Sequence, residues 1–263
     1  MEKINVYDLD GNKKEVIDIP KIFKRKPRKD LIHKAIEVAQ SKKVQSQGRD
    51  ERAGLKNTAE GWGTGHGMSR APRIKGSGFP TARNVGRVPF ARGGRQSHPI
   101  KSKKNRKKKI NKKLNKISLI SAISASGNKE WVKKRGHLID HVPQIPFVVD
   151  DKIQTIKKTS QIYSKLSELG FKEEMERVKK NSKKIRAGKG KRRGRKYKKK
   201  RSILIVIKED FGIYKAARNI PGIDVVQLEN LSISDLAPGG LSGRLIVWTQ
   251  SAFNDLEKYR ELI

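Results

Sequence analysis

The sequence predicts an α/β fold, a mostly parallel sheet covered by helices, that carries a long irregular loop and a second, basic loop. Three observations predict it. Apolar runs of strand length recur in the last third of the chain with little polar alternation, as is typical of strands buried on both faces. Helical segments alternate with these runs, which favours parallel strands joined by helices. Residues 44–99, by contrast, show neither a helical nor an alternating apolar period.

The N-terminal residues predict a β-hairpin and one helix. The stretch from Ile4 to Ile19 alternates apolar and polar residues around an LDGN turn signal, and Pro20 ends it. Asp30 can cap a helix from Leu31 to about Lys43, in which apolar residues recur every three or four positions.

The rest of the globular part predicts helices that alternate with strands. Apolar residues continue at helical spacing out of a lysine block, so one helix is expected from about Arg106 to Ala125. Gly170 is a helix stop signal, and Thr249 can cap a final helix. The apolar residues of that helix are Ala252, Phe253, Leu256 and Tyr259. The other expected helices span about 130–135, 157–169, 173–181, 214–219 and 232–236, and the expected strands span 147–149, 203–207, 223–226 and 245–248.

The composition restricts the class of partner. The chain has 263 residues and a formal net charge of +37, which favours a polyanionic partner: a nucleic acid, an anionic membrane surface or an acidic protein. No apolar run approaches the roughly 18 residues of a membrane span, and the N-terminus lacks a signal peptide's apolar core. Because there is no cysteine, disulfides and thiolate metal sites are excluded. We therefore expect a soluble intracellular protein.

The stretch from Val44 to Pro99 combines glycine with arginine. Arginine grips phosphate and stacks on bases, while glycine lets the backbone approach a ligand closely. The composition favours a loop threaded through folded RNA, inserted in a globular domain of residues 1–43 and 100–263; the alternative is a solvated, disordered loop. The residues expected to bind RNA here and just beyond are Arg49, Arg52, Lys56, Trp62, His66, Arg70, Arg73, Lys75, Arg83, Arg87, Arg92, Arg95, Lys103, Lys104 and Arg106.

A loop that runs out and back once would reverse near its middle. That middle lies at Ala71–Pro72–Arg73, where Pro72 stiffens the chain and Gly67 and Gly76 allow a reversal. We therefore expect the tip of the loop there, and we expect the free loop to be mobile, because its few apolar residues cannot offset the entropy of ordering it.

Residues 182–201 form a second basic stretch. It is too charged to fold alone and too rich in glycine for a helix, so it is predicted to be a second RNA-binding loop. Disordered basic segments commonly fold on their RNA. The residues expected to bind are Arg186, Lys189, Lys191, Arg192, Arg193, Arg195, Lys196 and Tyr197.

Motifs of enzymes and metal sites are weak in this sequence. The glycines of residues 61–67 lack the flanking strand and helix that give a dinucleotide motif its meaning, and residues 188–191 lack the Ser or Thr of a phosphate loop. His137 and His141 have helical spacing, but the proline at 143 favours a polar turn over a metal site. No nucleophile elbow is present, and acidic residues in the helices suit exposed faces. No catalytic residue, metal or cofactor is expected, although a nucleotide-dependent or RNA-modifying enzyme remains a rival class.

Four stretches resemble one known family. They are GWGTGHGMSRAPRIKGSG at residues 61–78, VPFARGGRQSHP at 88–99, IRAGKGKRRGRKYKKKRS at 185–202 and LAPGGLSGRLIVWTQSAF at 236–253. In this order they resemble the large-subunit ribosomal proteins of the universal protein-four family, in their archaeal and eukaryotic form.

The resemblance implies a structural role without catalysis. Such a protein binds large-subunit ribosomal RNA early in assembly, in the cytoplasm, and lines the peptide exit tunnel with its loop. Residues 61–78 would lie near the tunnel, with Met68, Ser69, Arg70 and Arg73 facing it, and residues 92–95 would grip RNA. The partners implied are ribosomal RNA, neighbouring ribosomal proteins and the nascent peptide. The alternative is a freestanding RNA-binding regulator, which would sediment in the light fractions of a lysate.

Overall fold

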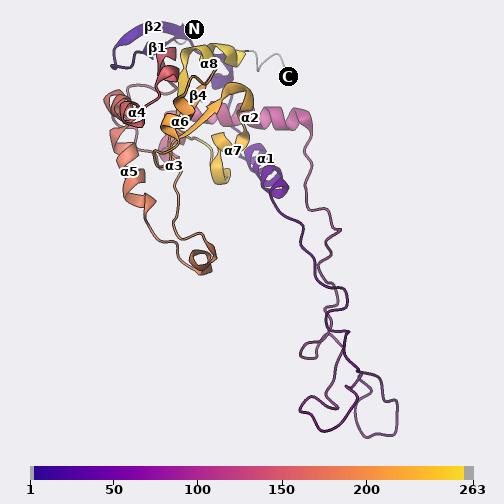
Figure 1. The fold of residues 1–263 in the computed structure, drawn as a ribbon. Coiled ribbons are helices and arrows are strands. Elements are labelled where there is room, and N and C mark those ends of the chain that lie inside the picture. The colour runs from indigo at the N-terminus through magenta and orange to yellow at the C-terminus, as the bar shows by residue number, and fades with distance from the viewer. Residues whose placement is uncertain (1–2, 258–263) are drawn as a thin grey trace. The chain divides into compact units, whose positions relative to one another are not determined.

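The chain divides into two compact units in a computed structural model that describes residues 3–257 (Figure 1). The globular unit comprises Met1–Gln40 and Lys108–Ile263. The second unit, Ser41–Lys107, is called the extension below.

One mixed sheet forms the centre of the globular unit. Its strand order is β2-β1-β3-β6-β4-β5. Only β2 runs antiparallel to its neighbour, as the partner of β1 in the N-terminal hairpin, and the other pairs are parallel. The predicted α/β class with a mostly parallel sheet is therefore confirmed. The strands are β1 (Lys3–Tyr7), β2 (Lys13–Asp18), β3 (Phe147–Val149), β4 (Leu204–Ile207), β5 (Asp224–Gln227) and β6 (Ile246–Thr249).

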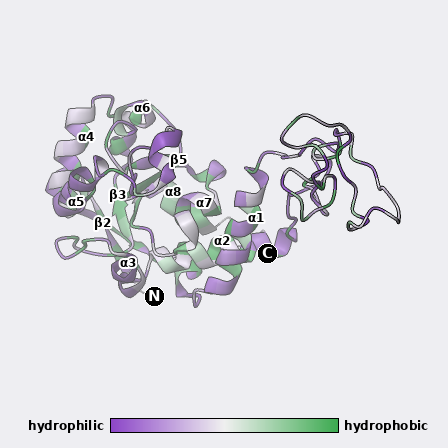
Figure 2. Ribbon diagram, turned by 90° about the horizontal axis from the view of Figure 1, so that it is seen from below, coloured by the Kyte–Doolittle hydropathy of each residue, from purple (hydrophilic) through white to green (hydrophobic). Residues whose placement is uncertain are grey.

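Helices cover both faces of this sheet. Along β3, Phe147 and Val149 face one hydrophobic cluster while Val148 faces the other, as the period of two of a strand requires. Because both clusters are apolar, the central strands β3, β4 and β6 show no polar alternation in sequence, and β3 is drawn in green in Figure 2. The helices are α1 (Lys29–Lys42), α2 (Lys112–Ser126), α3 (Lys129–Arg135), α4 (Thr159–Leu166), α5 (Lys172–Ser182), α6 (Ile213–Ala217), α7 (Ile233–Leu236) and α8 (Gln250–Asn254).

The helices form two groups, one for each hydrophobic cluster. Ile162 of α4, Met175 of α5 and Ile213 of α6 belong to the first cluster. Residues of α1, α2, α7 and α8 belong to the second, among them Ile32 and Ile123. The described members of both clusters all come from the globular unit.

Two predicted helix starts are wrong. Asp30 does not precede α1 but lies in its first turn, where its carboxylate pairs with Arg28 at 2.7 Å and favours the helix N-terminus. The helix expected from Arg106 begins only at Lys112. Residues 101–109 are mostly lysine and contain no apolar side chain that could hold a helical turn against a core.

The stop signal at Gly170 is confirmed, with a physical reason. Gly170 has φ +91°, and a Cβ there would lie 2.4 Å from the carbonyl oxygen of His141. A wide helical turn, Ser167–Phe171, therefore separates α4 from α5.

The final helix is shorter than expected. Thr249 occupies the cap position of α8, but its buried hydroxyl makes no hydrogen bond within the described chain. A 3-10 turn, Asp255–Glu257, follows, and the predicted apolar Tyr259 lies outside the described residues.

Candidate nucleic-acid interface

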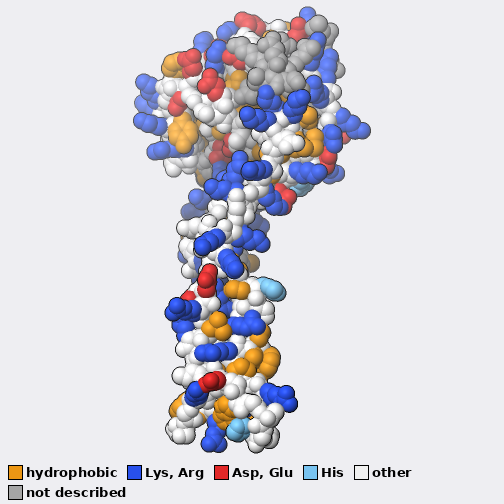
Figure 3. All heavy atoms as spheres, turned by 90° about the vertical axis from the view of Figure 1, so that its right-hand side faces the viewer, with side chains coloured by type: hydrophobic (Ala, Val, Ile, Leu, Met, Phe, Trp, Pro, Cys, Tyr) orange, Lys and Arg blue, Asp and Glu red, His pale blue; other side chains and the backbone are white. Residues whose placement is uncertain are grey.

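Positive charge is concentrated in two segments. The extension holds 17 Lys and Arg against three Asp and Glu, for a net charge of +14 in 67 residues. Residues 182–201, called the basic segment below, hold 13 Lys and Arg and no acidic residue. Figure 3 shows Lys and Arg spread over the extension with few carboxylates among them. These two segments carry nearly half of the chain's 63 cations, so they define the candidate site.

Three short stretches of the extension pair with one another. Arg73 forms isolated antiparallel bridges with Glu60 on one side and with Val85 on the other. The backbone N–H of Glu60 donates to the carbonyl of Arg73 at 3.0 Å, and the reverse bond measures 2.9 Å. The chain therefore reverses twice, within residues 61–72 and within residues 74–84. The prediction of a single reversal at Ala71–Pro72–Arg73 is wrong, because backbone pairing makes Arg73 the middle of three stretches.

The side chain of Arg73 makes contacts inside the extension. Its guanidinium donates to the carbonyl of Arg83 at 3.0 Å and to Oγ of Ser69 at 3.2 Å. It also lies 6.0 Å from the centre of the Trp62 ring, whose other neighbour is the ring of His66 at 5.5 Å. These contacts fix the stretch that contains the two aromatic rings.

Close backbone packing joins the two arms of the extension. A Cβ on Gly54 would lie 2.4 Å from the carbonyl carbon of Gly94 in the other arm. Gly94 is also tightly packed within its own arm, where a Cβ would lie 1.9 Å from the carbonyl oxygen of Val88. Arg49 adds a hydrogen bond from its guanidinium to Gln96 at 3.1 Å. Glycines that were expected to approach RNA therefore also let the backbone of the extension pack closely on itself, a role that the sequence did not predict.

Some predicted RNA-binding cations have partners within the extension. Lys56 pairs with Asp50 at 2.5 Å, Lys75 pairs with Glu60, and Arg87 donates to the carbonyl of Asn57 at 2.8 Å. Hydrogen bonds from the two lysines lower the pKa of Asp50 and of Glu60. Such exposed pairs contribute little to stability. Of the described extension, the predicted side chains without a polar contact are Arg52, Arg70, Arg83, Arg92, Arg95, Lys103, Lys104 and Arg106.

The two sides of the basic segment pair with each other as an irregular hairpin, which was not predicted from the sequence. Ile185 and Tyr197 form an isolated antiparallel bridge, and the N–H of Arg186 donates to the carbonyl of Lys196 at 2.8 Å. A 3-10 turn, Lys189–Arg193, closes the end. The sequence feature that could have predicted this hairpin is a set of three glycines, at 188, 190 and 194, which lie between an isoleucine and a tyrosine. The hairpin displays its cations on exposed side chains.

A buried carboxylate joins the two ends of the basic segment. Glu174 lies on α5, which precedes the segment, and its Oε1 accepts a hydrogen bond at 2.6 Å from Ser202, which follows it. Arg177 donates to both carboxylate oxygens, at 2.6 and 2.8 Å, and the Leu138 N–H donates at 3.0 Å. The prediction that helix carboxylates suit exposed faces is wrong for Glu174, whose side chain is fully buried.

His137 completes this network from the end of α3. Its Nδ1 lies 2.7 Å from Oε1 of Glu174, and its buried Nε2 has no partner in the described chain. Burial lowers the pKa of His137, so the ring is neutral at pH 7 and donates its Nδ1–H to the carboxylate. Burial alone would raise the pKa of Glu174, but hydrogen bonds from Arg177, His137 and Ser202 lower it to about 2.

A second polar cluster fixes the residues just before β4 and the first residue of β5. The buried guanidinium of Arg244 donates to the carbonyls of Ser202 and Asp235, at 2.7 and 2.8 Å, and to Asp224 at 2.5 Å. Asp224 also pairs with Arg201, the last residue of the basic segment. Burial lowers the pKa of Arg244. The basic segment is therefore attached to the globular unit by buried polar groups at both ends.

The two histidines with helical spacing contact different carboxylates. Helix α3 ends at Arg135, and both histidines lie in the irregular stretch that follows it. Of the two, His141 lies in a turn, as the sequence predicted, and His137 does not. His141 is exposed and its Nε2 lies 3.1 Å from Glu173. Within residues 3–257, no group of three or more possible ligands gathers. In the same range, the helices are all too short or too polar to cross a membrane.

Comparisons with known proteins all point to one family. The family model described as "Ribosomal protein L4/L1 family" matches residues 17–259. The chain is 42% identical to the large ribosomal subunit protein uL4 of Methanopyrus kandleri over 96% of its length and 97% of the relative's. It is 43% identical to the proteins of that name from Methanosphaera stadtmanae (97% and 96% covered) and Methanococcoides burtonii (98% and 98%). The chain belongs to the ribosomal protein L4/L1 family.

Proposed function

We propose that this chain is a structural constituent of the large ribosomal subunit, in the cytoplasm, and that it has no enzymatic activity. The relatives from Methanopyrus kandleri and Methanosphaera stadtmanae are both named large ribosomal subunit proteins. The observation that carries the proposal is the extension, where 17 cations stand against three carboxylates. Only two small residues of the described extension, Ala59 and Gly86, are fully buried, so a polyanion must supply most of its ordering.

The proposed mechanism is charge neutralisation. Lysine and arginine side chains of both segments neutralise crowded phosphates of ribosomal RNA, which lets RNA helices pack closely. Each phosphate contact releases counterions, so log K falls against log salt with a slope of about −0.9 per contact on a duplex. Backbone N–H groups of the glycine-rich stretches donate to phosphate and sugar oxygens.

The predicted binding residues take two roles in this proposal. The exposed cations without internal partners contact the RNA backbone, for example Arg52, Arg70 and Arg92. Arg73 and Trp62 act indirectly, because their mutual contact fixes the stretch that carries Arg70. In the basic segment, the cations of the hairpin turn contact RNA while its two ends stay attached to the globular unit.

Residues 61–78 line the peptide exit tunnel in this proposal, next to the nascent peptide. Met68, Ser69 and Arg70 are exposed, whereas Arg73 holds the stretch from within. A photoreactive amino acid at Met68 of the full chain tests this in translating ribosomes, with one at the exposed Phe90 of the same extension as the control. We expect crosslinks to nascent chain from position 68 and not from position 90. Equal crosslinking from both positions, or none from position 68, contradicts the tunnel assignment.

RNA binding itself is tested by titration of the full chain with purified large-subunit ribosomal RNA at several salt concentrations. We expect tight binding with a steep salt slope. Weak binding, or binding that does not depend on salt, contradicts the proposal.

A further inference from the structure

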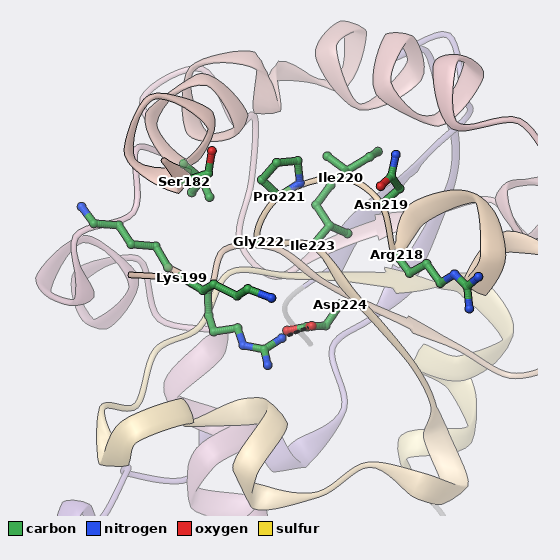
Figure 4. A pocket seen from close by; sticks show the side chains of 12 residues that line it. Ser182, Lys199, Arg218, Asn219, Ile220, Pro221, Gly222, Ile223 and Asp224 are labelled. Carbon is green, nitrogen blue, oxygen red and sulfur yellow. Dashed lines mark hydrogen bonds and ion pairs between the residues drawn. The ribbon is translucent and has the colours of Figure 1, made fainter. Parts of the chain in front are cut away.

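A cavity of about 410 Å³ opens beside the C-terminal end of the basic segment. Its lining comes from three places: the end of α5, residues 199–201 before β4, and the turn 218–224 between α6 and β5. Figure 4 shows Ser182 and Lys199 on one side of this turn and Arg218 and Asn219 on the other. Pockets of roughly 300–1,000 Å³ bury most of a small organic molecule, and a mononucleotide is of that size.

The lining combines an apolar floor with a cationic wall. Val178, Ile220 and Ile223 are buried side chains that contribute to the floor. Lys199, Lys200 and Arg218 contribute ammonium and guanidinium groups that have no polar partner in the described chain. This is the chemistry of a nucleotide site, in which the base packs on apolar surface and the phosphate meets cations.

The carboxylate in the cavity does not oppose an anion. Asp224 is paired with Arg201 and with the buried Arg244, so two guanidinium groups neutralise it. Asn219 offers a side-chain amide that makes no hydrogen bond in the described chain, and an amide can pair with the edge of a base. The lining therefore has groups for phosphate and for base.

Close packing fixes the walls of the cavity in the absence of a ligand. Gly222 has φ +86°, and a Cβ there would lie 2.7 Å from a methyl carbon of Val178. The N–H of Ser202 donates to the carbonyl of Gly222 at 2.8 Å. Because these contacts fix the turn against α5 and the start of β4, a ligand would not have to order the walls.

We propose that this cavity takes one unpaired nucleotide of the ribosomal RNA, splayed out of its stack. The inference rests on the proposed RNA-binding function, because an RNA backbone that follows the basic segment would reach Lys199 and Lys200 at the cavity mouth. Recognition of unstacked bases is the common mode of sequence-specific RNA binding.

A charge-neutral filling variant separates this site from general polycation binding. Ser182→Trp, at the end of α5, places an indole in the cavity and removes no cation. Ser160→Trp, at an exposed position on α4, is the matched control. The full chain of each is bound to large-subunit ribosomal RNA, and base reactivity is probed nucleotide by nucleotide.

We expect one unpaired nucleotide that wild type and Ser160→Trp protect and that Ser182→Trp leaves reactive. Affinity should fall about tenfold in Ser182→Trp, the scale of losing one packed base, while the salt slope stays the same. Asn219→Ala is a second test at an exposed position, where a substitution does not disturb the core. This variant should leave the same nucleotide reactive. If Ser182→Trp and Asn219→Ala both protect the RNA as wild type does, the inference is wrong although the proposed function stands. If wild type itself does not bind the RNA, the proposed function fails as well.

Discussion

At the scale of single residues, Glu174 determines how the basic segment is attached. Its carboxylate receives hydrogen bonds from residues on either side of the segment, and its side chain is fully buried. A buried charge is stable only when its hydrogen bonds are complete. Removing it should leave the Arg177 guanidinium and the Leu138 N–H without their acceptor.

This arrangement predicts a defined acid sensitivity. The folded-state pKa of Glu174, about 2, lies below its usual value, so its stabilisation is complete above the usual carboxyl pKa and disappears as pH falls towards 2. The pKa of His137 is also lowered by burial, so below about pH 6.5 unfolding lets this ring take up a proton, and the fold loses further stability there. Glu174→Gln should lower the free energy of unfolding by about 3 kcal/mol at pH 7 and much less at pH 3.

Denaturant unfolding at both pH values measures the effect of Glu174→Gln. Glu173→Gln, the exposed neighbour that pairs with His141, is the control and should change stability by less than about 0.5 kcal/mol. An equal loss at pH 3 and pH 7 would show that the effect comes from packing and not from the charge.

At the scale of elements, the turn of the basic segment is predicted to supply phosphate contacts. Replacing Lys189, Lys191, Arg192 and Arg193 with glutamine should flatten the salt slope of RNA binding by about 3 to 4, because four contacts are lost. The control replaces four exposed lysines elsewhere on the globular unit: Lys13, Lys21, Lys158 and Lys172. If both quadruple variants change the salt slope equally, the turn of the basic segment contributes no more phosphate contacts than other exposed lysines do.

The close backbone packing of residues 88–94 in the extension gives a second prediction at this scale. Gly94→Ala places a methyl group onto the carbonyl oxygen of Val88, while Gly61→Ala, with ordinary backbone angles, meets nothing nearer than 4.0 Å. Overpacking costs about 1–3 kcal/mol, so Gly94→Ala should weaken RNA binding by roughly 5- to 150-fold. Gly61→Ala should bind within about twofold of wild type, measured in the same titration. Equal affinities for the two variants would mean that RNA binding does not depend on the close packing of residues 88–94.

Elements differ in how well the sequence predicts them. The strands of the parallel sheet could be predicted, because a strand that is buried on both faces has a continuous apolar sequence, as in Leu204–Ile207. The pairing of Arg73 with Glu60 and Val85 could not, because backbone bridges between irregular stretches leave no periodicity. The burial of Glu174 was missed for a similar reason. The sequence around Glu174 is that of a charged, exposed helix, and its partners Ser202 and His137 come from distant parts of the chain.

At the scale of the whole molecule, the described hydrophobic core lies in one unit, whereas the proposed RNA contacts lie on both. The described members of both hydrophobic clusters lie in the globular unit. Deleting residues 53–87 should therefore leave the sheet folded, with a melting temperature within about 3 °C of wild type, since no described core contact is lost. Circular dichroism and thermal unfolding of the shortened chain measure this. A loss of cooperative unfolding would show that the extension supports the core.

The central claim is that the chain is held in the large ribosomal subunit by its two basic segments. Sedimentation of a lysate that contains the tagged full chain tests it most directly. We predict that the chain travels with large-subunit particles, and that the variant lacking residues 53–87 and carrying the four glutamines in the basic segment moves largely to the light fractions. Recovery of the full chain in the light fractions, as expected for a freestanding RNA-binding regulator, would contradict the account.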